Sequence, residues 1–140
     1  MYQPYRLILG SPMSGKTCLA IELALKQSKP VYTDIVDNTS DKSFLPDSFK
    51  SIPNGDWTLI QEPAFIIYNS CEYIPEFCSA NYQGDKHRLT ELLKLKHFGH
   101  EIVFIFQHLK FVCFEIKALA EIIKLEPDFK GRRSFKGLTQ

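Results

Sequence analysis

The sequence is poor in the residues that mark secreted, metal-bound or strongly charged proteins. It has four cysteines, Cys18, Cys71, Cys78 and Cys113, which lack the close spacing of metal ligands. The start of the chain carries no secretory signal, so a reducing cytosol is the expected compartment, the host's cytoplasm if the chain is viral. The net charge is +1 at pH 7, and this near balance gives no general case for binding nucleic acid or membranes.

Long apolar runs and arginine are also scarce. The most apolar region, residues 102–123, is interrupted by charged side chains such as Lys110 and Glu115, so we expect no transmembrane segment. The chain has four arginines. A nucleoside or nucleotide kinase needs several of them to clamp the transferred phosphate, which makes a small kinase the weakest of the enzyme classes considered below.

The strongest signal that is present is a phosphate-binding loop. Residues 10–17, GSPMSGKT, match the pattern G-x-x-x-x-G-K-[ST]. The apolar residues 5–9 precede the loop as a strand and the amphipathic residues 18–26 follow it as a helix, which is the required order. The pattern therefore predicts the phosphate site of a nucleotide triphosphatase, against the alternative of a Gly-bounded turn with an accidental Lys-Thr.

Several positions of this loop have an expected task. Gly10 and Gly15 permit backbone angles that let successive N–H groups face a phosphate at the start of a helix. Lys16 is expected to contact the β- and γ-phosphates, and Thr17 to bind Mg²⁺. The predicted nucleotide-binding residues are Gly10, Ser11, Pro12, Met13, Ser14, Gly15, Lys16, Thr17 and Cys18.

The rest of the chain alternates strand and helix signals. This order predicts an α/β domain with three layers, in which a mostly parallel central sheet is flanked by helices, as in P-loop NTPases. We place this domain at residues 1–127 and a basic tail at residues 128–140, where a solvated, frayed end is the simplest expectation. Strands are expected at residues 30–35, 64–68 and 101–107, a strand or packing patch at 57–60, loops at 42–56 and 73–83, and helices at 85–97 and 111–125.

Polar residues follow three of these strands, at the edge where ligands bind in open α/β sheets. Asp34 follows the second strand, either as a turn residue or as a functional acid that binds Mg²⁺. The strand at 64–68 lacks the acids that usually orient Mg²⁺ and the attacking water. Either Asn69 or Glu72 replaces those acids, or the site binds nucleotide and hydrolyses it poorly. Gln107 ends the last strand and is expected to point to the same edge.

The order of these signals resembles the zonula occludens toxin family, whose N-terminal ATPase domain is shared with assembly proteins of filamentous phages within the FtsK–HerA group. The resemblance covers about residues 5–125. Alignment on Pro75 puts Tyr68 and Asn69 where the family has Asp-Glu, and the membrane span and outer segment usual in these assembly proteins are absent. The matching stretches are residues 10–17, 30–35, 65–75 and the basic-His-x-Gly turn, strand and Gln of residues 96–107.

The resemblance implies an ATP- and Mg²⁺-binding motor domain of a virus or mobile element. Lys16 and Thr17 would hold phosphate and metal, and Gln107 would sense the γ-phosphate or hold the attacking water. The implied partners are further copies of the chain, virion-assembly proteins, or an assembly complex at the inner membrane, with DNA as an open alternative. A nucleotide-binding pseudo-ATPase with a structural or regulatory task is the second hypothesis, and a small nucleotide kinase is the third.

Overall fold

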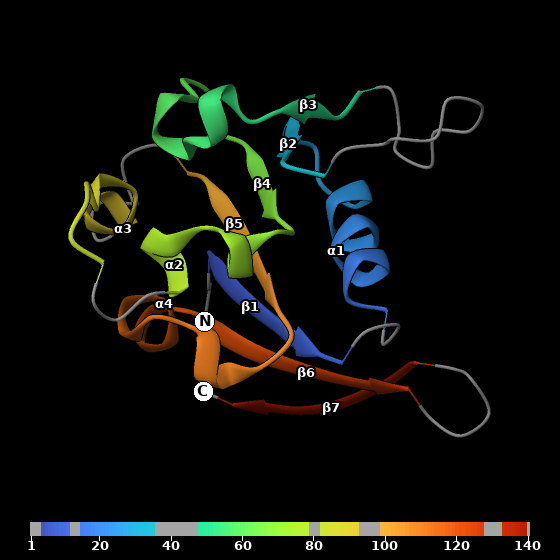
Figure 1. Ribbon diagram of the computed structural model, residues 1–140. Coiled ribbons are helices and arrows are strands. Elements are labelled where there is room, and N and C mark those ends of the chain that lie inside the picture. Colours follow the sequence, from blue (N-terminus) through green and yellow to red (C-terminus); the bar gives the residue numbers. More distant parts are fainter. Residues whose placement is uncertain are drawn as a thin grey trace, which may run out of the picture.

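The computed structural model describes residues 4–11, 15–35, 48–78, 82–92, 99–127 and 133–139. Figure 1 shows a central twisted sheet with α1 on one face and α2, α3 and α4 on the other. The predicted three-layer α/β fold is therefore confirmed. The helices are α1 (Lys16–Leu25), α2 (Pro75–Cys78), α3 (His87–Leu92) and α4 (Phe114–Leu119).

The described strands form one sheet in the order β3-β2-β4-β5-β1-β6-β7. All neighbouring strands run parallel except β6 and β7, which are antiparallel. The carboxyl ends of β1, β4 and β5 thus meet at one edge, as expected for a ligand site. The strands are β1 (Tyr5–Gly10), β2 (Val31–Thr33), β3 (Lys50–Ser51), β4 (Phe65–Tyr68), β5 (Glu101–Phe106), β6 (Glu121–Pro127) and β7 (Arg133–Thr139).

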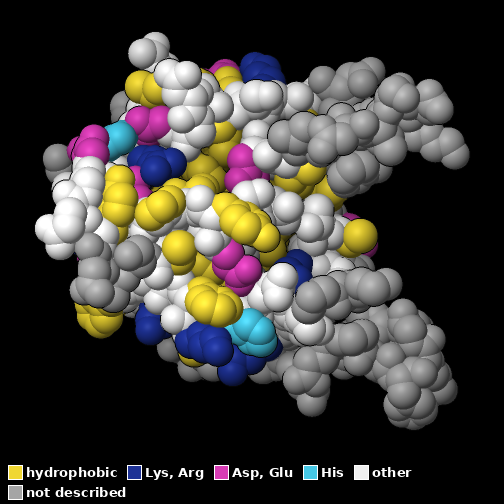
Figure 2. Space-filling view, in the orientation of Figure 1, with side chains coloured by type: hydrophobic (Ala, Val, Ile, Leu, Met, Phe, Trp, Pro, Cys, Tyr) yellow, Lys and Arg dark blue, Asp and Glu magenta, His cyan; other side chains and the backbone are white. Residues whose placement is uncertain are grey.

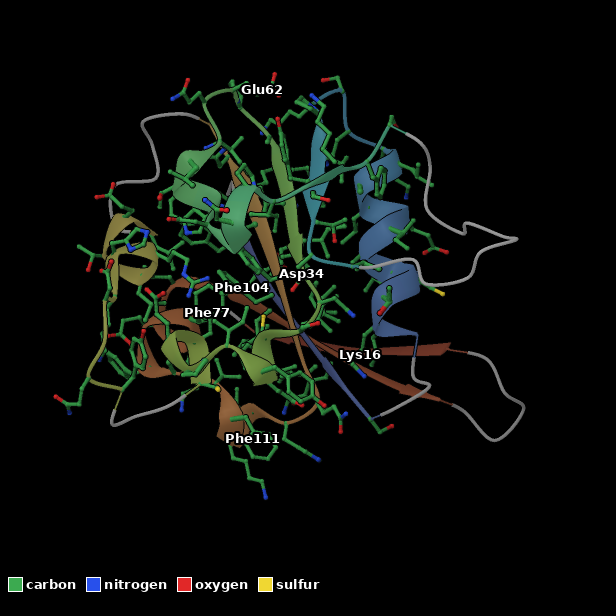
Figure 3. All side chains as sticks on the ribbon, turned by 45° about the horizontal axis from the view of Figure 1, so that its top comes forward. Lys16, Asp34, Glu62, Phe77, Phe104 and Phe111 are labelled. Carbon is green, nitrogen blue, oxygen red and sulfur yellow. The ribbon has the colours of Figure 1, made fainter. Side chains whose placement is uncertain are left out.

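The hydrophobic core is divided by the sheet into two layers. Every residue of β4 and β5 is buried, which is the pattern of parallel strands covered on both faces. On the face of α2, α3 and α4, Tyr68, Phe77 and Phe104 form a cluster of aromatic rings, and the rings of Phe77 and Phe104 (Figure 3) meet edge to face with centroids 5.4 Å apart. The layer beside α1 contains Ile8, Ala20, Ala24, Val31, Phe65, Ile67, Val103, Ile105, Ile123 and Leu125.

The helix predicted at residues 111–125 is confirmed only for Phe114–Leu119, and its second half is wrong. Helix α4 ends at Leu119, Ala120 is extended, and β6 begins at Glu121. Residues Ile122 and Ile123 pair with Leu7 and Ile8 of β1, and such β-branched side chains fit a pleated, half-buried surface. Pairing with β1 therefore determines the conformation of residues 121–127, although their apolar residues have helical spacing.

Other boundaries differ from expectation in smaller ways. Residues 57–60 are not a strand, because Trp57–Leu59 forms a 3-10 helix that buries the indole of Trp57. The expected loop at 73–83 contains α2. Residues 133–139, within the expected frayed tail, form β7. The second half of the helix expected at 85–97 lies largely outside the described residues.

His87, at the start of α3, is flanked by two acids and gives the fold a pH dependence. Its Nε2 lies 2.5 Å from Asp56 Oδ2, and its Nδ1 lies 2.8 Å from Asp85 Oδ2. The hydrogen bond to Asp56 raises the pKa of His87, and partial burial opposes this rise. The ion pairs are therefore complete below the ordinary histidine pKa of about 6.5 and are lost as the pH rises through the higher folded value.

We expect the stability difference between the wild type and His87→Gln to shrink as the pH is raised from 6 to 9. Because the histidine is half exposed, the pairs contribute less than about 1 kcal/mol. Urea denaturation of both proteins across this range measures the difference. A gap that widens with pH would contradict the assignment of a charged His87.

Candidate nucleotide site

The glycine that ends the loop between β1 and α1 has the backbone conformation that the phosphate-binding pattern predicts for it. Gly15 has φ 91° and ψ 18°, a left-handed conformation that L side chains disfavour, and it stands directly before α1. Lys16 is the first residue of α1, and its Nζ donates a hydrogen bond to Ser11 O at 2.9 Å. The lysine thus lies across the loop. Pro12, Met13 and Ser14 lie outside the described residues, and Cys18 is exposed on α1.

A cleft of about 210 Å³ opens beside this loop. It is formed where α1 begins, where β5 ends, and by the 3-10 helix Cys71–Tyr73 that follows β4. Figure 3 shows Lys16 at the start of α1. Four of the predicted site residues, Lys16, Thr17, Glu72 and Gln107, therefore come together, and the whole lining is Lys16, Thr17, Asn69, Ser70, Glu72, Tyr73, Ile105, Phe106 and Gln107.

Asn69 lies beside Thr17. The Thr17 hydroxyl donates to Asn69 Oδ1 at 2.8 Å. Tyr68 does not line the cleft, because its fully buried side chain accepts a hydrogen bond from Trp57 N and donates one to Gly55 O. Of the two residues that stand where acids are expected, Asn69 is thus the one that faces the loop.

Glu72 connects the loop after β4 to the end of β5. Its Oε2 accepts a hydrogen bond from the backbone N–H of Gln107 at 2.6 Å. Burial lowers the pKa of Lys16, and the negative charge of Glu72 opposes that effect. The lining of the cleft therefore holds one carboxylate and one ammonium group.

Asp34 lies behind this wall rather than in the cleft lining. Its carboxylate accepts hydrogen bonds from Asn69 N at 2.6 Å and from Ser70 N at 3.1 Å. Burial raises the pKa of Asp34, while these two N–H groups act in the other direction. Asp34 contacts the residues of the site through their backbone.

Comparison with known proteins identifies the family. A family model described as "Zonular occludens toxin (Zot)" matches residues 6–126. The chain belongs to the Zot family. The family resemblance expected from residues 10–17, 30–35, 65–75 and 96–107 is confirmed.

The Zot-family chain is similar to a phage protein and to a solved structure. It is 34% identical over 118 residues to "Putative assembly protein ORF301" of Pseudomonas phage Pf3, a match that covers 81% of this chain and 39% of that protein. It thus spans well under half of that relative. The crystal structure of the N-terminal domain of zonular occludens toxin from Neisseria meningitidis matches with a TM-score of 0.68 and 18% identity, over 96% of this chain and 83% of that one. At this identity the structural match supports the fold.

The residues of this Zot-family cleft fit a magnesium ion only if a nucleotide brings ligands of its own. Among the described residues, no group of three or more His, Cys, Asp and Glu side chains could hold a metal ion. Mg²⁺ commonly takes one or two protein oxygens together with phosphate oxygens and water. The Thr17 hydroxyl, which lines the cleft, suits that arrangement.

Sequence reasoning missed part of the Zot-family cleft. Tyr73, whose side chain is 86% exposed, lies at its rim, and Phe106 forms part of its wall. Nothing in the spacing of these residues marks them, since an aromatic residue in a loop or strand is usually a packing residue.

Near the end of β5, His108 and Lys110 are exposed, and Figure 2 shows His and basic side chains together at the lower margin of the molecule.

No helix in the described part of the Zot-family chain has the length and apolar character needed to cross a bilayer.

Proposed function

We propose that this chain is an ATP-binding motor domain, related to FtsK–HerA ATPases, that couples the state of the nucleotide to virion assembly or extrusion. The proposal rests on one observation: Lys16, Thr17 and Glu72 line the same cleft, beside Gly15, whose backbone has a left-handed conformation. The phage relative is named as a putative assembly protein, which supports the biological setting. Self-association into a ring or other oligomer, and contact with further assembly proteins, a membrane complex or DNA, belong to this proposal.

Each residue of the cleft has a task in this proposal. Lys16 would leave Ser11 O and neutralise the β- and γ-phosphates, and the Thr17 hydroxyl would help to hold a magnesium ion bound with the nucleotide. Bound Mg²⁺ would stabilise the charge that develops on the phosphates. Glu72 is the one carboxylate in the lining, so it would orient the attacking water, with Gln107 beside it.

The test of this proposal is the separation of binding from hydrolysis. We expect Glu72→Gln to bind ATP as the wild type does but to hydrolyse it about 100-fold more slowly, the usual loss when a positioned base is removed. Steady-state phosphate release and binding of a fluorescent ATP analogue measure the two effects. Glu22→Gln, an exposed residue of α1, is the control and should leave both unchanged.

A second candidate function is a pseudo-ATPase that binds nucleotide and acts as a structural or regulatory subunit. The specific observation in its favour is that Thr17 meets the neutral amide of Asn69 where an acid is expected. Tight ATP binding with no turnover in the wild type, and turnover gained in Asn69→Asp, would favour this function. Turnover in the wild type that Glu72→Gln removes would exclude it.

A further inference from the structure

Asp34 is fixed at the sheet edge by its own backbone. It follows β2, and its N–H donates to Ile67 O at 3.2 Å, which extends the pairing between β2 and β4. The hydroxyl of the preceding Thr33 accepts a hydrogen bond from Ile35 N at 3.1 Å and stabilises the turn. The carboxylate of Asp34 therefore starts from a rigid strand end.

This carboxylate spans two consecutive backbone N–H groups of the neighbouring loop. One oxygen accepts from Asn69 N at 2.6 Å and the other from Ser70 N at 3.1 Å. Hydrogen bonds to an ionised acceptor are about twice as strong as neutral ones. Within the ranges that the structure describes, no Lys, Arg or His forms an ion pair with Asp34. The charge of Asp34 is therefore directed at the backbone of this loop.

The residues held in this way are the ones that meet the phosphate-binding loop. Asn69 and Ser70 both line the cleft, whereas Asp34 does not. The side chain of Asn69 accepts the hydrogen bond from Thr17 at 2.8 Å. A hydrogen bond at this distance weakens steeply once donor and acceptor move apart or lose their alignment. Release of the loop backbone would therefore break the contact between Asn69 and Thr17.

We propose that Asp34 is a positioning residue. Its carboxylate holds the backbone of Asn69 and Ser70, so that the side chain of Asn69 keeps its hydrogen bond with the hydroxyl of Thr17. This assigns Asp34 a role through the loop instead of the direct contact with Mg²⁺ that the sequence suggested. Because residue 69 is neutral, the carboxylate of Asp34 also places a negative charge behind the two residues that line the cleft. Its effect on magnesium rests on the proposed function, but its effect on the loop does not.

Amide hydrogen exchange tests the positioning without any nucleotide. In Asp34→Asn one carboxylate oxygen becomes an NH₂ group, which cannot accept from a backbone N–H. We expect exchange at Asn69 and Ser70 to become about tenfold faster or more, while the strand amides of β4 keep their protection. Asp85→Asn, which changes an exposed acid on another loop, is the matched control. Unchanged exchange at Asn69 and Ser70 in Asp34→Asn would overturn the proposal.

Nucleotide binding with and without Mg²⁺ tests the consequence at the site. Mg²⁺ is expected to increase the affinity of the wild type for ATP. In Asp34→Asn and in Asn69→Ala this increase should be about tenfold smaller, as is usual when a supporting residue of a metal site is lost. The affinity for ATP without Mg²⁺ should be unchanged in both variants. Asn69→Ala should keep the slow amide exchange, because it retains the backbone N–H groups. If the Mg²⁺-dependent increase in ATP affinity falls in Asp34→Asn but not in Asn69→Ala, Asp34 does not act through Asn69.

The two proposals fail in different ways. A wild-type chain that binds no nucleotide would end the proposed function, and the exchange experiment would still decide whether Asp34 holds the loop. If Asp34→Asn does not fold, Asp34→Ser keeps a small polar side chain at the position and should show the same faster exchange. Retained protection in that variant would count against the positioning role.

Discussion

Lys16→Ala is expected to lose ATP binding, with an affinity at least about 100-fold below that of the wild type. Two hydrogen bonds from a charged donor contribute about 1.5–3 kcal/mol each, and about 2.7 kcal/mol corresponds to this factor. Lys16 lies at the start of α1 and lines the cleft, and Ser11 O holds its ammonium group. Hydrolysis should disappear with binding. Isothermal titration calorimetry and phosphate release measure the two losses.

The matched control is Lys26→Ala, which removes the same charge from the other end of α1. Lys26 is the exposed C-cap residue of that helix and makes no part of the cleft lining. It should bind and hydrolyse ATP as the wild type does. Equal affinity in the wild type and Lys16→Ala would mean that the loop at residues 10–17 is not the nucleotide site.

The second large effect is expected on stability, from Glu76→Ala. The carboxylate of Glu76 is buried, accepts from Arg88 Nε at 2.5 Å and accepts from Leu89 N at 3.1 Å. Its removal leaves the largely buried Arg88 guanidinium, stacked on Phe77, without its carboxylate. Breaking a buried pair in this way costs about 3 kcal/mol, which for a domain of this size lowers the Tm by roughly 10 °C.

A double variant separates the lost pair from the lost packing. We expect Glu76→Leu combined with Arg88→Met to be more stable than Glu76→Ala, because no buried charge then remains without a partner. Lys50→Ala, which breaks the exposed pair with Glu62 (Figure 3), serves as the control and should leave the Tm nearly unchanged. Thermal denaturation followed by circular dichroism measures all variants. A Glu76→Ala variant as stable as Lys50→Ala would contradict the buried pair.

Much of the fold could be predicted from local patterns because the central strands are buried on both faces. The apolar runs of β4 and β5 and the Gly-rich loop before α1 leave few alternative conformations. The segment at residues 121–127 could not be predicted in this way. Its strand depends on pairing with β1, more than 100 residues earlier, and a local pattern carries no such information.

The site, like the fold, could be predicted from sequence only in part. The loop itself is a continuous motif, so Lys16 and Thr17 could be placed from sequence. Gln107 is expected at the same sheet edge, and it lines the cleft with them. The register of the loop after β4 could not be derived, because a shift of one residue exchanges Tyr68 and Asn69 between core and cleft. The contact of Asp34 with two backbone amides depends on loop geometry, which residue types do not reveal.

The position of β1 in the sheet has a consequence for how the chain folds. Tyr5 of β1 pairs with Ile102 on one side, and Ile8 pairs with Ile123 on the other. The strand that carries the phosphate-binding loop therefore finds its neighbours only after about a hundred further residues have been synthesised. Loops of this length make pairing slow, and an apolar strand stays open to wrong contacts in the meantime. We therefore expect the cleft beside this loop to form late, after β5 and β6 have been synthesised.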